Sequence, residues 1–198
     1  MIDVSKFFKQ KEDDLTKWGF SKELRDEDFR NCLGDTFKKE ANVLTKYINS
    51  FPNWGRKGLL LQSTGNFAHK PLKKTLIITH NIVKKIYDRG KIKNFILYID
   101  SGIFFTNPFE LPEIDVDRGE ELLLRKADLV VFQGFSSVKL STYGTNKLSR
   151  ILYYFLKNST PFIMSITDSD TTLEGKLLPE SYYLLKKLTR KIEFRDLI

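Results

Sequence analysis

Short apolar runs alternate with longer amphipathic segments along most of the chain, and this alternation limits the fold more than any other feature. The apolar runs cover residues 58–62, 94–99, 129–132 and 161–166. Strands that are buried on both faces of a parallel sheet have this composition. A last strand is predicted at 190–194, where Ile192 and Phe194 alternate with polar residues. The sequence therefore predicts an α/β three-layer sandwich around a mainly parallel sheet.

Helices are predicted between the strands wherever apolar residues recur every three or four positions. We expect them at 4–17, 35–50, 70–89, 118–126, 145–157 and 179–188, and we expect irregular chain at 101–116, which contains two prolines. Neither an internal repeat nor a clear linker divides the sequence. The simplest organisation is an N-terminal lead-in with a short helix over 1–34, followed by one α/β domain over 35–198.

Composition narrows the class of partner and the compartment. Lys and Arg outnumber Asp and Glu by 33 to 25, and a net charge of +8 favours polyanionic partners such as nucleic acid. The single cysteine, Cys32, excludes a disulfide within the chain and a cysteine-based zinc site, and two histidines do not suggest a metal site. Without a signal peptide or a membrane-length apolar stretch, a cytoplasmic protein with no membrane partner is expected.

The segment between the strand at 58–62 and the helix at 70–89 stands where a phosphate-binding loop would lie. A working loop has the pattern G-x-x-x-x-G-K-[ST]. Without gaps, Ser63 and Ala68 replace its glycines, His69 replaces the lysine and Lys70 replaces the hydroxyl residue. Shifting by one residue makes Lys70 the lysine but puts Thr64 and His69 at the glycines. The altered loop therefore comprises Ser63, Thr64, Gly65, Asn66, Ala68, His69 and Lys70, and an ordinary connection and a modified anion site both stay open.

Several stretches resemble the AAA+ domain of bacterial replicative-helicase loaders and the related transposition helper ATPases. These stretches are 20–29, 38–50 with 57–61, 127–132, 161–165 and 191–194, so the resemblance covers roughly 20–195. It implies a P-loop NTPase-like (AAA+) three-layer sandwich. The full loaders carry an N-terminal helicase-binding domain, and only about 20 residues precede the resemblance here, so a complete loading activity is not expected.

The departures from the family pattern predict a loss of catalysis. Gln133 and Gly134 stand where the Walker B strand ends in two acidic residues that hold Mg²⁺ and orient water. The polar sensor-1 position falls on Ile166 or Thr167, and the arginine that serves a neighbouring subunit falls near Tyr183 or Leu184. The resemblance thus implies a pseudo-ATPase without catalytic residues or a required cofactor; whether ATP or ADP still binds is left open.

Basic and aromatic residues supply candidate nucleic-acid contacts. On the helix at 70–89, Lys73 and Lys84 lie eleven residues apart, as do Lys74 and Lys85, so each pair shares a helical angle. This ridge is a candidate for tracking a phosphate backbone, and a solvated helix face is the alternative. The tyrosine pairs 153–154 and 182–183 are candidates for stacking on bases, although one ring of each pair is expected in the core.

Three functions remain in competition. The first is an inactive loader-like protein that acts in DNA replication by binding a replicative helicase, a helicase loader or single-stranded DNA, with or without forming an oligomer. The second is an active ATPase that uses His69 or Lys70 on phosphate. The third is an interaction module unrelated to replication, because a fold does not determine a function.

Overall fold

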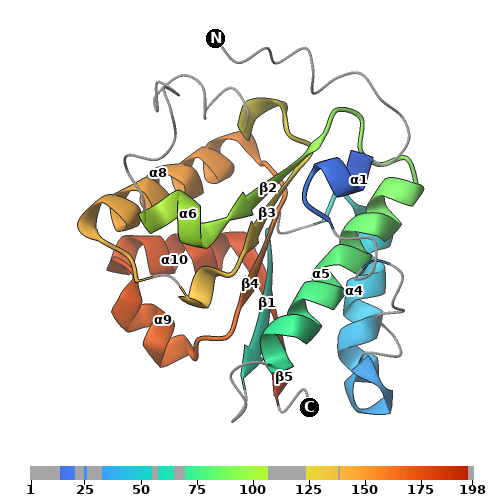
Figure 1. Ribbon diagram of the computed structural model, residues 1–198, viewed down its shortest axis with the longest axis horizontal. Coiled ribbons are helices and arrows are strands. Elements are labelled where there is room, and N and C mark those ends of the chain that lie inside the picture. Colours follow the sequence, from blue (N-terminus) through green and yellow to red (C-terminus); the bar gives the residue numbers. More distant parts are fainter. Residues whose placement is uncertain are drawn as a thin grey trace.

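The protein is built around a five-stranded, all-parallel sheet. The computed structural model describes residues 14–20, 25, 33–54, 58–64, 70–106, 124–137 and 139–195. The strands lie in the order β2-β3-β4-β1-β5 (Figure 1). Their bounds are β1 Gly58–Thr64, β2 Ile96–Asp100, β3 Leu129–Gln133, β4 Phe162–Ile166 and β5 Thr189–Arg195. The first strand of the sequence is therefore paired with β4 and β5, which lie far from it along the chain.

Helices cover both faces of the sheet and complete three layers (Figure 1). One face carries α1 (Asp14–Lys17), α4 (Lys38–Ser50) and α5 (Lys70–Asp88). The other face carries α6 (Ser101–Thr106), α8 (Thr142–Asn158), α9 (Asp170–Lys176) and α10 (Pro179–Leu188). Two 3-10 turns, η2 (Asp35–Phe37) and η3 (Phe135–Ser137), lie beside α4 and after β3. In the part of the chain that the structure describes, no helix is long and apolar enough to cross a membrane.

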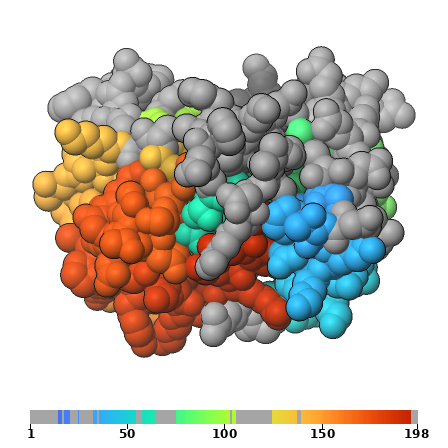
Figure 2. All heavy atoms as spheres, turned by 90° about the horizontal axis from the view of Figure 1, so that it is seen from below, coloured from blue at the N-terminus to red at the C-terminus, as the bar shows by residue number. Residues whose placement is uncertain are grey.

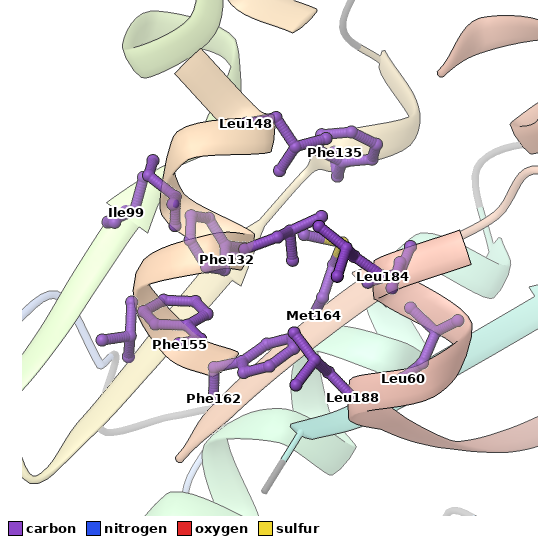
Figure 3. Packing of buried hydrophobic residues seen from close by; sticks show 14 of the residues in the cluster. Leu60, Ile99, Phe132, Phe135, Leu148, Phe155, Phe162, Met164, Leu184 and Leu188 are labelled. Atoms are coloured by element: carbon purple, nitrogen blue, oxygen red, sulfur yellow. The ribbon is translucent and has the colours of Figure 1, made fainter. Parts of the chain in front are cut away.

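Each face of the sheet has its own hydrophobic core because side chains of a strand alternate between faces. Toward α8 and α10, the rings of Phe155 and Phe162 stack with centroids 4.7 Å apart, and Phe132 lies beside them (Figure 3). Toward α4 and α5, Leu59 and Leu61 pack in the second core. The described part of the lead-in belongs to this second core, since Leu15 and Phe20 are fully buried in it.

The predicted sheet and most of the predicted helices are confirmed, with shifts of a few residues at their ends. The five predicted strands all form, and the helix predicted at 179–188 has these bounds. The helix predicted at 35–50 begins with the η2 turn and becomes α-helical at Lys38. The helices predicted at 4–17 and 118–126 lie mostly outside the described residues; Asp14–Lys17 and residues 124–126 are helical.

The prediction of irregular chain at 101–116 is wrong for its first six residues, which form α6. The Asp100 Oδ1 atom accepts a hydrogen bond of 2.8 Å from the Gly102 N–H, so a strand-end carboxylate caps this short helix. Residues 107–116 lie outside the described part. The helix α9 was not predicted either, and it is capped by Ser169, whose Oγ accepts from the Thr172 N–H at 3.1 Å.

Close packing at the start of β1 should make Gly58 intolerant of a side chain. A Cβ atom there would lie 2.5 Å from the Phe162 ring and 2.8 Å from the Thr189 methyl group. We expect Gly58→Ala to lower the free energy of unfolding by about 1–3 kcal/mol in urea denaturation, because the surrounding core has no room to yield. Gly175→Ala is the matched control, since nothing lies within 4 Å of its Cβ position in α9. The control should be neutral or stabilising by up to about 1 kcal/mol, and equal losses for both variants would contradict this account.

Candidate functional site

The candidate site lies at the edge of the sheet that is formed by the carboxyl ends of the parallel strands. In open α/β sheets, ligands bind beyond the carboxyl ends of the strands, where the order of connections reverses. Here β1 lies next to β4, with β3 beyond it, so the ends of these three strands meet at one edge. Figure 2 views the molecule from the side on which β5 ends. A P-loop NTPase would hold its nucleotide at this edge.

The structure places only the two ends of the altered phosphate loop. Ser63 and Thr64 are the last residues of β1, and Lys70 is the first residue of α5. Residues 65–69 and the Lys70 side chain lie outside the described part, so a cradle for phosphate stays a prediction. The Ser63 hydroxyl is buried and has no hydrogen-bond partner among the described residues.

An amide and a glycine stand at the end of β3, as the sequence predicts. Gln133 is buried, and its Oε1 atom accepts a hydrogen bond of 3.4 Å from the Ser165 hydroxyl on β4. Gly134 follows with a φ of 70°, a left-handed conformation that favours glycine over an acidic residue. Asp100, which is opposite Gln133 in the β2–β3 register, is exposed and caps α6. The β3 strand itself therefore presents no carboxylate to this edge.

A lysine from α9 ties together the segments that follow β3 and β4. The Lys176 Nζ atom donates to the carbonyl oxygens of Phe135 at 3.3 Å and Ser136 at 2.8 Å. It also forms an ion pair of 3.2 Å with the Asp168 carboxylate, and both side chains are only about 15% exposed. The Ser136 hydroxyl in turn accepts from the backbone N–H groups of Thr167 and Asp168. The chain therefore cross-links these two loops with its own side chains.

The same polar network reaches β1 and β5. The Gln62 amide donates to the Asp168 carbonyl oxygen at 2.7 Å and to the Asp170 carboxylate at 3.1 Å. Lys191 on β5 pairs with Asp170 at 2.8 Å, and this hydrogen bond from Lys191 holds the pKa of Asp170 below its usual value. Polar contacts thus connect β1 and the loops after β3 and β4 in a half-buried setting, and an exposed ion pair extends them to β5. Sequence reasoning missed this network because α9, which brings Lys176 back to Asp168, was not predicted.

The remaining candidate residues are spread over several surfaces. Lys84 and Lys85 are half-buried and interact within the chain, while the side chains of Lys73 and Lys74 lie outside the described part. Tyr154 and Tyr182 are partly buried against the core, whereas Tyr153 is 45% exposed and Tyr183 is 63% exposed. One ring of each pair therefore belongs to the core, as predicted. Whether the ridge or the exposed rings bind nucleic acid stays untested.

The residues predicted at the sensor-1 and arginine positions lie on β4 and α10 and in the loop after β4. Ile166 is the buried last residue of β4, and the Thr167 N–H is held by Ser136. Tyr183 is exposed on α10 and Leu184 is buried. Among the described residues, no three His, Cys, Asp or Glu side chains are grouped so that they could hold a metal ion.

A shallow groove lies beside this edge. It has a volume of about 450 Å³ and runs between the N-terminal half of α4 and the edge strand β5 (Figure 2). Its lining mixes charges of both signs with apolar groups: Thr36, Phe37, Lys39, Glu40, Val43, Arg190, Lys191, Ile192 and Glu193. The mixed lining does not select one class of ligand.

This strand order and layer arrangement define a P-loop, AAA+-type α/β fold, and comparison with solved structures agrees. The DnaC helicase loader superposes with a TM-score of 0.67 at 14% identity, covering 88% of this chain and 99% of that chain. DnaI superposes with a TM-score of 0.62 at 15% identity, covering 86% of each chain. The replication initiator DnaA bound to AMPPCP and single-stranded DNA gives 0.65 at 10% identity, covering 88% of this chain and 51% of DnaA.

These similarities confirm the predicted fold and the resemblance to helicase loaders. At such low identity they establish the fold alone. No family model matches the sequence. No curated protein matches it either.

Removing Lys176 should destabilise the protein more than removing the other lysine of the network. We expect Lys176→Met to lower the free energy of unfolding by about 2–3 kcal/mol, because it leaves the Asp168 carboxylate and two carbonyl groups without their charged donor. Lys191→Met is the matched control: its pair with Asp170 is well exposed, and its loss should cost less than about 1 kcal/mol. Urea unfolding of both variants measures the difference, and equal effects would show that Lys176 does not hold the loops.

Proposed function

We propose that this protein is a catalytically inactive, AAA+ helicase-loader-like protein that acts in DNA replication by binding a helicase, a loader or single-stranded DNA. The observation that carries the proposal is the pair of residues at the end of β3. Gln133 carries no negative charge there, and its Oε1 atom accepts a hydrogen bond from the Ser165 hydroxyl. Phosphoryl transfer depends on charge stabilisation and on metal ligands at this position.

The network around Lys176 supports independence from nucleotide. In AAA+ proteins the loops after β3 and β4 carry the groups that respond to nucleotide, as the family resemblance implies. Here Lys176, Asp168 and Ser136 hold these loops together through contacts within the chain. A fixed arrangement of these loops is suited to a protein that uses the shape of the fold rather than a hydrolysis cycle.

The choice of partner rests on the fold similarity to replication proteins and on the net charge of the chain. The structures with the same fold include proteins described as helicase loaders and DnaA bound to single-stranded DNA. The net charge of +8 favours an acidic partner surface or a nucleic acid. The fold similarity and the net charge both favour a partner in the replication machinery, and neither selects one component of it.

An active ATPase is the competing function, and Asp100 is the observation that favours it. This carboxylate stands beside Gln133 on the neighbouring strand, where it is exposed. Together with His69 or Lys70 it would have to replace the Walker residues. Its hydrogen bond to the Gly102 N–H gives it a structural role instead, so we rank this function second.

The purified protein should hydrolyse no ATP above background in the presence of Mg²⁺. Turnover that is abolished by a His69→Ala/Lys70→Ala double variant, but retained by Lys84→Ala, would establish the active enzyme and contradict our proposal.

The binding role predicts co-elution with the cell's replicative helicase or its loader, or a salt-dependent complex with a single-stranded oligonucleotide. Absence of all three complexes would remove the replication role.

A further inference from the structure

An aromatic and apolar face stands out on the helix pair α8 and α10. Tyr153 and Leu156 on α8 are 45% and 38% exposed, and Tyr183 on α10 is 63% exposed. Tyr153 and Leu156 lie three residues apart, so they share one side of α8. Glu180, Tyr183 and Lys187 are spaced by three and four residues, so they form one ridge of α10.

Two contacts fix these ridges side by side. The hydroxyl groups of Ser149 and Ser181 are hydrogen-bonded to each other at 2.5 Å between the helices. Farther out, the Tyr153 hydroxyl donates to the Glu180 carboxylate. This hydrogen bond raises the pKa of Tyr153. The two contacts therefore join the ridges of α8 and α10 into one face.

The surroundings of the face are basic. Lys157 lies four residues after Tyr153, and Lys187 lies four residues after Tyr183, with its Nζ atom 6.0 Å from the centre of that ring. Both lysines are exposed, and the acidic member of the two ridges, Glu180, is already engaged by Tyr153. Tyrosine-rich patches with a charged rim are typical of the centre of protein interfaces.

The side chains favour a protein over a nucleic acid. Leu156 is 38% exposed and offers no aromatic plane on which a base could stack. An amphipathic helix with an apolar ridge and flanking carboxylates fits better, since its ridge would cover the tyrosines and its acids would meet Lys157 and Lys187.

We propose that the α8–α10 face, formed by Tyr153, Leu156, Glu180, Tyr183 and Lys187, docks an acidic amphipathic helix of a partner protein. This inference deepens the proposed binding function by naming the surface and the chemistry of the partner, and it rests on that function. Docking at this face requires neither a nucleotide nor the phosphate loop.

The test uses a fluorescein-labelled helical peptide of about 18 residues, with leucines on one ridge and glutamates flanking it. Fluorescence anisotropy should show saturable binding to the full-length protein that weakens as salt increases. Tyr183→Ala and Lys187→Glu should each weaken binding about 10-fold or more, because they remove an exposed anchor and a complementary charge. Tyr143→Ala and Lys91→Glu are the matched controls on other exposed surfaces, and they should leave binding unchanged.

Three outcomes would overturn the docking face. In the first, the acidic peptide does not bind at millimolar concentration. In the second, it binds, but Tyr183→Ala and Lys187→Glu leave its affinity unchanged. In the third, a peptide with lysines in place of the glutamates binds equally well. If a dT oligonucleotide binds through Tyr183 and Lys187 while the peptide does not, the face is a nucleic-acid site and the inference fails. Because the assay contains no ATP, its failure would leave the proposed independence from nucleotide untouched.

Discussion

The hydrogen-bonded pairing of β4 with both β1 and β3 is the constraint on which the rest of the structure depends. Leu60 on β1 lies opposite Met164, and Phe132 on β3 lies opposite the same residue, so β4 joins two strands that are far apart in sequence. This pairing creates the two cores and brings the ends of β1, β3 and β4 to one edge. A register change of one residue would turn Gln62 and Ser165 to the wrong faces and would dismantle the polar network.

At that edge, polar side chains of the chain form contacts with one another. Charged groups that are taken out of water need partners, and in an ATPase phosphate and metal provide some of them. Here Lys176 finds its partners in Asp168 and two carbonyl groups, and Gln62 finds them in the loop after β4. These internal contacts are the reason why we connect the network with the proposed binding role.

The sequence was sufficient for the elements whose signal is local. The buried strand at 129–132 was predicted from its continuous apolar composition, and the structure extends it by one residue. The strand order was not predicted, since pairing between distant strands leaves no local signal; only the fold class came from the family resemblance. The fold similarity to DnaC and DnaI confirms the predicted fold class.

The helices and side-chain contacts that were not predicted depend on residues that are distant in the sequence. The helix α9 is short and its N-cap Ser169 follows a polar stretch, so its periodicity is weak, and α6 is capped by the carboxylate of Asp100. Without α9, nothing in the sequence indicated that Lys176 and Asp168 meet, or that Gln62 reaches Asp170. The hydrogen bond from Tyr153 to Glu180 likewise joins α8 and α10, which are separated along the sequence by β4 and α9.

The central claim is that the strand-end network replaces nucleotide, and thermal unfolding with and without ligand tests it most directly. A ligand that binds the folded state raises its stability by RT ln(1 + [L]/Kd), about 2.7 kcal/mol at a concentration 100 times Kd. We predict that the melting temperature of the protein stays unchanged when ATP or ADP is added at millimolar concentration, with or without Mg²⁺. A rise of several degrees that grows with nucleotide concentration would contradict the account, because it would mean that the loop at 63–70 binds phosphate.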